Sequence, residues 1–585
     1  MTWHVEEAAG ALDARASSRG VLTPAEFSFE DMGWSCDPEN CQPKIAALAS
    51  LANLAAPDPV AGVAYTSHGN LLIVGASSAG PARACAAKLA TDLHVTLLAD
   101  DAQDAAAGYA NWSGRVASIT GYLGEFTTTI EGLRIAGAAQ GASIAPAKFD
   151  LVLDFSTPPL FPMAQPPQGY FRAVSDAEGM DAILEDLRVA VGEFEKPRYF
   201  AYRESLCAHS RSSITGCNAC IEVCSTQAIS ADGDHVKVDP HLCMGCGACS
   251  TVCPSGAMGF QFPRPADRGA QLKQLLSSYR HAGGRDACIV FHNSGDGREM
   301  LAHAAASGRG LPARALPLEA WHVASVGIDL LLPAIAYGAN QVAIVSAGSE
   351  TDEYVAALQA QMAIAQAVLS GLGYAGCHFT LIRARVADDL AGAFDTLAPA
   401  SGVDVPATFM LPNDKRAAVE FAVEHLQKQS PARPEAIALP AGAPYGQVLV
   451  DRKKCTLCMS CAGACPASAL MDGTDQPLLK FVERNCVQCG LCEQTCPEDA
   501  ITLAPRLLLT PAVREACVLN ETQPCNCVSC GKAFGTRLMV DAMLARLGGH
   551  SMFADEAAKR RLRMCADCRV VDMMANKNEA SILRM

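Results

Sequence analysis

"CTLCMSCAGACP", residues 455–466, and "CVQCGLCEQTCP", residues 486–497, share one cysteine spacing, C-x2-C-x2-C-x3-C-P. "CMGCGACSTVCP", residues 243–254, is a third copy. In runs of this kind three close thiolates bind one [4Fe-4S] cluster and the fourth binds the neighbouring cluster. Four thiolates are needed because each iron completes a tetrahedral sulfur environment. The three runs therefore predict ferredoxin-like modules.

A fourth run is incomplete in its spacing. "CAHSRSSITGCNACIEVC", residues 207–224, ends in C-x2-C-x3-C and lacks a first cysteine at the usual distance. We predict that Cys207 takes this place behind a longer loop, because loop insertions are tolerated when their ends can still meet. Ser225 stands where the other runs have proline. The alternative is that Cys207 binds nothing and its cluster is absent or has three irons.

Cross-ligation within each pair of runs predicts four [4Fe-4S] clusters, at sites that we number I to IV. Site I is Cys207, Cys217, Cys220 and Cys253; site II is Cys243, Cys246, Cys249 and Cys224; site III is Cys455, Cys458, Cys461 and Cys496; site IV is Cys486, Cys489, Cys492 and Cys465. These sites use 16 of the 27 cysteines.

A second kind of metal site is predicted near the C-terminus. "CNCVSC" and "MCADC" supply Cys527, Cys530, Cys565 and Cys568, two C-x2-C pairs that suit a structural zinc ion. Cys525 is an alternative ligand, and a further iron–sulfur centre is an alternative metal. "TRLMVDAMLARLGG", residues 536–549, reads as a helix between the two pairs.

Four cysteines stand alone in apolar surroundings and are predicted to be core residues: Cys85, Cys288, Cys377 and Cys517.

Residues 70–100 have the outline of a dinucleotide-binding βαβ unit. Gly75 and Gly80 match the first and third glycines of the fingerprint, Ser77 replaces the second, and Asp100 falls where an acid would bind the ribose. The incomplete glycine pattern favours a plain βαβ element that binds no flavin or NAD.

Residues 285–384 alternate apolar strands with helices, which predicts a parallel sheet covered by helices. "NDKRAAVEFAVEHLQKQ", residues 413–429, reads as an amphipathic helix whose charged side chains face solvent.

The predicted fold class is α/β multidomain: Rossmann-like parallel-sheet domains, two ferredoxin-like 2[4Fe-4S] modules and a zinc-ribbon-like four-cysteine region. The predicted divisions are an N-terminal segment (1–60), an α/β domain with the degenerate dinucleotide-binding-like unit (61–200), the first module (201–264), a parallel-sheet domain (265–440), the second module (441–506) and a helical region with the four-cysteine site (507–585).

The net charge and the hydropathy of the chain limit the kinds of partner that we expect. The net charge of -15 argues against nucleic acid and anionic membrane surfaces as partners. No apolar stretch reaches the length of a membrane-spanning helix, and the first residues lack the features of a signal peptide. We therefore expect a cytoplasmic protein without membrane insertion.

The chain resembles the 4Fe-4S cluster-binding, polyferredoxin-like proteins encoded beside bacterial formate dehydrogenases. The resemblance runs from about Met32 onward and rests on "MGWS" (32–35), "WSGRV" (112–116), the run from Cys207, "AWHVASVGIDLLLPAIAYGANQVAI" (320–344) and "CVSCGKAF…RLRMCADCR" (527–569). It implies that Cys207 is a cluster ligand. The central α/β stretch is also similar to an iron–sulfur subunit domain of hydrogenase–heterodisulfide reductase systems, without that domain's cysteines.

Three functions remain open at this point. The first is electron transfer by four clusters, with a formate dehydrogenase or its electron acceptor as the partner that the resemblance implies. The second is a non-catalytic assembly factor for formate dehydrogenase. The third is a flavin- or NAD-linked oxidoreductase subunit. We expect an electron carrier or subunit rather than an independent enzyme.

Overall fold

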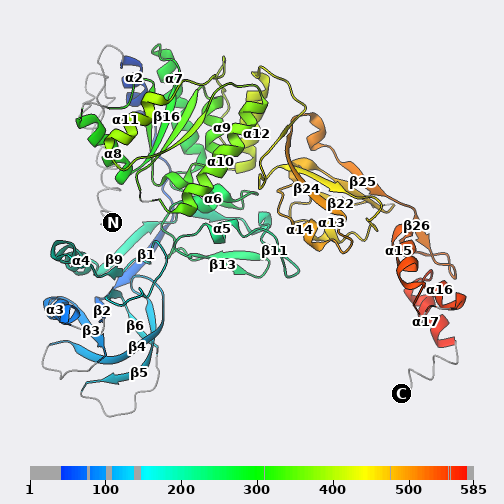
Figure 1. The fold of residues 1–585 in the computed structure, drawn as a ribbon, viewed down its shortest axis with the longest axis horizontal. Helices are drawn as coiled ribbons and strands as arrows, with labels where there is room; N and C mark the ends of the chain where they lie inside the picture. Colours follow the sequence, from blue (N-terminus) through cyan, green and yellow to red (C-terminus); the bar gives the residue numbers. More distant parts are fainter. Residues whose placement is uncertain are drawn as a thin grey trace.

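The computed structural model describes residues 41–75, 80–100, 108–136, 146–307, 310–348, 350–474, 476–550, 553 and 555–575. It is a mixed α/β multidomain molecule that contains two parallel sheets. In Figure 1 a sheet domain lies at the lower left, a helix-covered sheet above it, and the C-terminal helices at the far right. "MGWS" and Ser77 lie outside the described residues.

The N-terminal sheet domain has seven strands in the order β6-β5-β4-β3-β2-β7-β8. β2, β3, β7 and β8 are parallel, and β2 and β7 are apolar and buried along almost their whole length, which is typical of a sheet covered on both faces. The elements are β2 (Asn70–Val74), α3 (Gly80–Leu89), β3 (His94–Ala99), β4 (Ala110–Thr120), β5 (Phe126–Ile135), β6 (Ala147–Phe149), β7 (Leu151–Asp154), β8 (Tyr170–Arg172) and α4 (Ala177–Val189).

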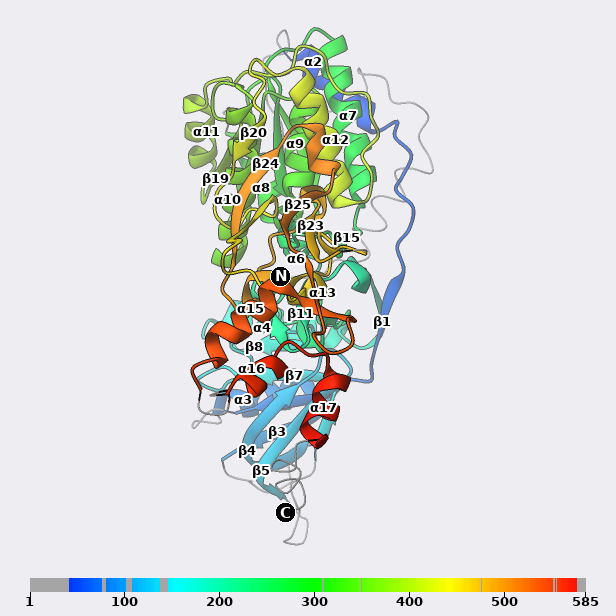
Figure 2. The same cartoon turned by 90° about the vertical axis from the view of Figure 1, so that its right-hand side faces the viewer.

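This domain is joined to the rest of the molecule by a two-stranded ribbon. β1 (Gly62–Ser67) leads into the domain and β9 (Gly192–Pro197) leads out of it, and the two strands pair antiparallel from Gly62 and Pro197 to Ser67 and Gly192. In Figure 1 the ribbon lies between the sheet domain and the larger body, and in Figure 2 β1 runs along the edge of the molecule toward the sheet domain.

The central domain is built on a four-stranded parallel sheet with the order β17-β16-β18-β19. All six residues of β16 and of β18 are buried, because helices cover both faces. α2, before the N-terminal domain in the sequence, packs here against α7. The elements are α2 (Gln42–Leu51), α7 (Pro265–His281), β16 (Cys288–Asn293), α8 (Asp296–Ala306), β17 (Ala315–Ala320), α9 (Ile328–Ala336), β18 (Gln341–Ser346), α10 (Asp352–Gly371), β19 (Phe379–Arg383), α11 (Ala387–Thr396) and α12 (Lys415–Lys428).

The first cysteine-rich module lies against the central domain and combines short helices with small antiparallel pairs. Its elements are β10 (Phe200–Tyr202), β11 (Ser210–Arg211), β12 (Ile214–Thr215), α5 (Ala219–Glu222), β13 (Ile229–Asp232), β14 (His235–Val238), α6 (Ala248–Val252) and β15 (Met258–Phe260).

The second module repeats this design and is extended by strands on both sides. Its elements are β20 (Ala436–Ala438), β21 (Gly446–Val450), α13 (Ser460–Ala464), β22 (Leu470–Asp472), β23 (Leu478–Phe481), α14 (Leu491–Thr495), β24 (Ile501–Leu508) and β25 (Cys517–Glu521).

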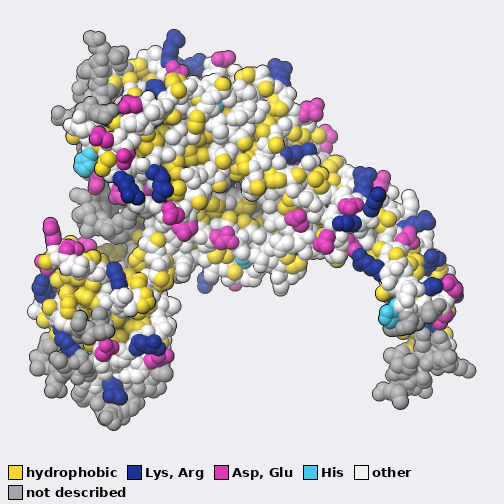
Figure 3. All heavy atoms as spheres, viewed as in Figure 1, with side chains coloured by type: hydrophobic (Ala, Val, Ile, Leu, Met, Phe, Trp, Pro, Cys, Tyr) yellow, Lys and Arg dark blue, Asp and Glu magenta, His cyan; other side chains and the backbone are white. Residues whose placement is uncertain are grey.

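The C-terminal region contains the hairpin β26 (Pro524–Asn526) and β27 (Ala533–Thr536), followed by α15 (Arg537–Leu547), α16 (Glu556–Arg561) and α17 (Ala566–Ala575). The predicted helix between the cysteine pairs is confirmed as α15, which begins at the Thr536 N-cap. Among the described residues, no helix is long and apolar enough to cross a bilayer. On the face drawn in Figure 3, basic and acidic side chains are interspersed.

Two expectations from the sequence are corrected. Cys85 and Cys288 are buried as predicted, but Cys377 and Cys517 are exposed, because each lies where a strand begins at the edge of a sheet. The charges of α12 do not all face solvent either: Lys415 is buried, because its stem and ammonium enter the contact between the central domain and the first module.

Candidate metal centres

The three complete cysteine runs share one backbone conformation. In each run, one residue before and one residue after the second cysteine has a positive φ angle: Gly245 and Gly247, Leu457 and Met459, Gln488 and Gly490. Glycine is needed at two of these positions because a Cβ on Gly245 would lie 2.6 Å from the Tyr199 ring and one on Gly247 would lie 2.5 Å from Ser325. The alternating turns curl each loop around a common point.

The longer loop after Cys207 is a β-hairpin. β11 and β12 pair across Ser212 and Ser213, which both have positive φ, as in a two-residue type I′ turn. The hairpin returns the chain so that the Cys217 amide donates to the Ala208 carbonyl at 2.9 Å. The nine-residue loop between Cys207 and Cys217 therefore closes on itself and brings the two cysteines together.

The cysteines predicted for sites I and II raise one another's pKa values. Burial, together with the thiolates of Cys253, Cys217 and Cys207, raises the pKa of Cys220 to about 12. Burial also raises the pKa of Cys249 strongly, with contributions from the site II cysteines Cys246, Cys243 and Cys224. Crowded, buried thiols favour the neutral form until a metal compensates their charge.

Sites III and IV show the same pattern. Burial and the thiolates of Cys455, Cys458 and Cys496 raise the pKa of Cys461 to about 12. At site IV, burial and the thiolates of Cys486, Cys489 and Cys465 raise the pKa of Cys492. In both cases the contributing thiolates include the fourth cysteine of the other run, and the assignment of the ligand sets stays a prediction.

The sulfur atoms also receive hydrogen bonds from the protein. The amides of Met258, Ala469 and Ala500 donate to the sulfurs of Cys253, Cys465 and Cys496 at 3.4, 3.2 and 3.4 Å. Such bonds to sulfur are one means by which a protein tunes the potential of an iron–sulfur cluster.

A cavity lies at site III. It is lined by all four site III cysteines, together with Thr456, Leu457, Met459, Leu479, Glu498, Ala500 and Ile501, and has an empty volume of about 350 Å³. Four thiolates around a largely apolar cavity fit a [4Fe-4S] cluster in donor chemistry.

Ser225, the departure from proline, has a tertiary partner. Its hydroxyl contacts the Tyr354 hydroxyl and donates to Gln165 Oε1 at 3.2 Å. Tyr354, fully buried on α10 of the central domain, also hydrogen-bonds Cys246 of site II. A proline at position 225 would remove this link between the central domain and site II.

Buried lysines hold the ligand loops of the first module. Lys196 Nζ donates to the carbonyls of His241 and Cys243 at 2.7 and 2.8 Å. Lys415 Nζ donates to the carbonyls of Ser250, Thr251 and Cys253 at 2.9, 2.5 and 3.1 Å. No local pattern indicated either role, because both lysines lie outside the first module in the sequence.

The two modules meet at a junction between sites I and IV. Burial raises the pKa of Cys489 to about 11, and the thiolates that contribute are those of Cys465 and Cys486 in the same site and of Cys217 in site I. Beside it, Gly216 lies so close to α14 that a Cβ would be 2.7 Å from Leu491 Cγ.

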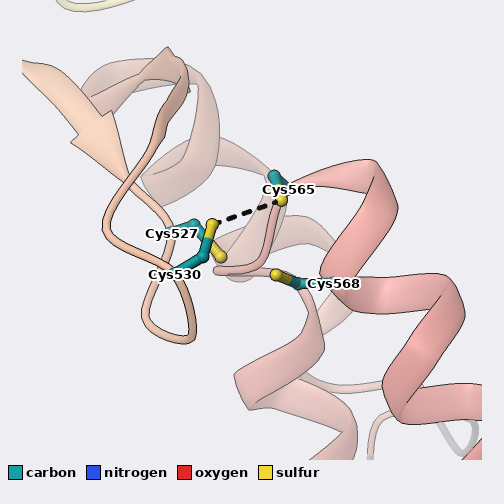
Figure 4. A group of neighbouring side chains, drawn as sticks. All are labelled: Cys527, Cys530, Cys565 and Cys568. Atoms are coloured by element: carbon teal, nitrogen blue, oxygen red, sulfur yellow. Dashed lines mark hydrogen bonds between the residues drawn. The ribbon is translucent and has the colours of Figure 1, made fainter.

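The C-terminal cysteine pairs form a separate group. The sulfurs of Cys527, Cys530, Cys565 and Cys568 all lie within 4.8 Å of one another, as Figure 4 shows, and the sulfurs of Cys530 and Cys565 are 3.8 Å apart. A tetrahedral zinc ion with Zn–S bonds of about 2.3 Å separates its sulfurs by about 3.8 Å. The group therefore suits a single metal ion. Cys525, in β26, is not a member of it.

The backbone prepares one thiolate of this group. Burial opposes ionisation of Cys527, but hydrogen bonds from the backbone of Cys530, Cys565 and Ser529 lower its pKa to about 6. A thiolate favoured before metal arrives is suited to coordination.

The dinucleotide-binding prediction stays a prediction. β2, α3 and β3 form the expected parallel βαβ unit, with Gly75 directly after β2 and Gly80 at the start of α3. Asp100 is exposed directly after β3.

Comparisons with known proteins agree with the cysteine sites. Residues 215–257 and residues 454–501 each match the family model of the 4Fe-4S dicluster domain. A ferredoxin of Alicyclobacillus acidocaldarius subsp. acidocaldarius is 44% identical over 62 residues, which are 11% of this chain and 80% of that ferredoxin. Through these two domains, the chain belongs to the 4Fe-4S dicluster ferredoxin family. Two dicluster domains imply four [4Fe-4S] clusters.

Larger relatives match over the same kind of segment. Hydrogenase-4 component A of Escherichia coli (strain K12) is 40% identical over 52 residues, 9% of this chain and 25% of that protein. The ferredoxin-type protein NapH of the same strain is 32% identical over 79 residues, 12% of this chain and 28% of that protein. The chain thus spans only about a quarter of the length of these two relatives.

Proposed function

We propose that the protein transfers electrons, and that its two dicluster domains form one relay of four [4Fe-4S] clusters. The observation that carries the proposal is the junction between the modules, where Gly216, next to Cys217 of site I, lies against Leu491 of α14, so close that a Cβ on Gly216 would be 2.7 Å from Leu491 Cγ, two residues from Cys489 of site IV. Bound clusters supply one-electron chemistry, while the chain fixes their order and surroundings.

The order of the sites supports a single path. Within the first module, the Cys220 thiolate of site I contributes to the raised pKa of Cys249 in site II. Within the second module, the Cys461 thiolate of site III contributes to the raised pKa of Cys492 in site IV. With the junction between the modules, the sites follow one another as II, I, IV and III.

A redox-poised EPR titration of anaerobically purified protein tests the proposal, with iron, zinc and flavin measured on the same sample. About sixteen irons per chain and several interacting signals at low potential are expected for a four-cluster relay. Sixteen irons that never change oxidation state would contradict the relay and favour an assembly factor. Bound flavin, or bleaching of the clusters by NADH alone, would instead favour a flavin- or NAD-linked oxidoreductase subunit.

The proposed partner is a redox protein, a formate dehydrogenase or its electron acceptor. This proposal rests on the resemblance described above, and the names of several relatives, among them hydrogenase-4 component A and NADH-quinone oxidoreductase subunit I 2, fit a redox partner in general. Reduction of the purified protein by formate dehydrogenase and formate, and not by formate alone, would support it. Failure of the reduced dehydrogenase to transfer electrons in either direction would contradict it.

We also propose that the C-terminal group binds structural zinc. Four thiolates at the spacing of one tetrahedral ion leave no position for a substrate, which is typical of structural rather than catalytic zinc. About one zinc per chain, resistant to reduction, is expected from elemental analysis.

A further inference from the structure

α12 begins where the central domain and both ferredoxin modules meet. Asp414 is its N-cap and accepts from the Ala417 amide at 3.0 Å. The next two residues, Lys415 and Arg416, point away from the solvent face that the amphipathic pattern suggests and contact the ligand loops of two different cluster sites.

The Lys415 ammonium donates its hydrogen bonds to the first module. Its three hydrogen bonds end on the carbonyls at the end of α6 and on that of Cys253, a ligand of site I. A cation near the last carbonyls of a helix is favoured by their partial negative charge. Lys415 therefore fixes the Cys253 loop to the central domain.

Arg416 contacts both modules. Its Nη1 donates to the carbonyls of Pro254 and Pro444 at 3.3 and 3.1 Å. Its Nη2 donates to the carbonyls of Arg484 and Cys486 at 2.8 and 3.1 Å. Pro254 follows a ligand of site I and Cys486 is a ligand of site IV, so one guanidinium bridges the loops of the two sites that meet at the junction.

Ion pairs along α12 reinforce this bridge. Asp414 pairs with Arg203 of the first module at 3.0 Å, and Glu420 pairs with Arg484 of the second at 2.7 Å. Arg514, beyond the second module, also pairs with Glu420, at 2.6 Å. The guanidinium of Arg416 lies over the Tyr445 ring, 4.7 Å from its centroid. The helix thus holds both modules from one side.

We propose that Arg416, supported by Lys415, is a positioning residue that clasps the two ferredoxin modules at the junction of sites I and IV and raises the reduction potentials of the clusters bound there. The inference rests on the proposed relay. A cluster gains negative charge when it is reduced, and a nearby cation in partly buried surroundings stabilises that charge. The planar, always charged guanidinium suits a bridge between several carbonyl oxygens.

The test compares the wild-type protein with Arg416→Gln, Arg416→Lys and Lys428→Gln, all reconstituted anaerobically with iron and sulfide. Lys428 is exposed at the other end of α12, so Lys428→Gln removes the same charge from the same helix away from the junction. The readouts are iron content, midpoint potentials from EPR titration, and the magnetic interaction between the reduced clusters of sites I and IV.

For Arg416→Gln we expect a full iron content, because no thiolate is lost. Two of the four midpoint potentials should fall by enough to change the oxidised-to-reduced ratio about tenfold at a fixed solution potential, about 59 mV for one electron. The magnetic interaction across the junction should weaken. Arg416→Lys should keep its potentials near those of the wild type and lose interaction, because one ammonium cannot bond four carbonyls in the same geometry. Lys428→Gln should match the wild type.

Potentials and interaction in Arg416→Gln equal to those in Lys428→Gln would overturn the proposal. If Arg416→Gln fails to bind iron, Arg416→Lys decides: an unchanged magnetic interaction in that variant overturns the clasp. A failure of the proposed electron relay would look different: the clusters of the wild-type protein would not change oxidation state in the titration.

Discussion

At the scale of single residues, Cys207 decides whether the protein has four clusters. The hairpin brings it to site I, and the Tyr202 hydroxyl hydrogen-bonds its sulfur. We expect Cys207→Ala to lower the iron content from about sixteen per chain to about fifteen if the site I cluster keeps three irons, or to about twelve if it is lost, because one of its four thiolates is missing. Elemental analysis with EPR checks this.

The matched control is Cys377→Ala, which removes an exposed thiol outside the modules and should leave the iron content unchanged. Sixteen irons per chain in Cys207→Ala, with the EPR spectrum of the wild type, would show that Cys207 is not the fourth ligand of a cubane.

A second prediction at this scale concerns the C-terminal group. Cys530→Ala should abolish zinc binding and leave the iron content unchanged, because the remaining three thiolates no longer close a tetrahedron. Hydrogen exchange in α17 should become faster, since Cys565 and Cys568 lie at its start. Cys525→Ala is the control and should keep its zinc. Zinc retained in Cys530→Ala would contradict the site.

At the scale of elements, β12 and α14 form the contact between the modules. A valine at Gly216 would meet Leu491 and, at 2.8 Å, the Ala208 carbonyl. We expect Gly216→Val to push the modules apart and to weaken the magnetic interaction between sites I and IV. Gly463→Ala, in α13 with open space around its Cβ, is the control. If the magnetic interaction in Gly216→Val is as strong as in Gly463→Ala, the contact between β12 and α14 does not set the distance between sites I and IV.

At the same scale, α12 differs from the expectation that its amphipathic pattern raised. α12 was predicted as a helix, and the structure bears this out. Its first turn contradicts the solvent-facing expectation because three domains converge there and supply carbonyl acceptors for Lys415 and Arg416. A hydrophobic pattern cannot indicate acceptors that come from residues 28 to 165 positions away.

At the scale of the whole molecule, the N-terminal sheet domain is an insertion on the β1–β9 ribbon. Replacing residues 68–191 by an Asn-Gly turn should leave a folded protein with all four clusters, because Ser67 and Gly192 already pair at the end of the ribbon. Iron content and the EPR spectrum check this.

The deletion removes two contacts to the first module: the Tyr122 ring stacked on His241 at 4.3 Å, and Gln165 with Ser225. Both lie on the side of site II, so any change in potential should be confined to that site. Loss of iron from all four sites would show that the domain is needed for folding of the modules.

The sequence by itself determined the cluster chemistry, because ligand spacing within a cysteine run is local: a few residues fix the turns that direct three thiolates to one point. It also determined the alternation of strands and helices in the two parallel-sheet domains. The tertiary structure alone decided how the modules face each other, since the Cys217–Cys489 junction and the Arg416 bridge join residues separated by up to 272 positions. Their formation depends on the packing of separate domains, which no local pattern records.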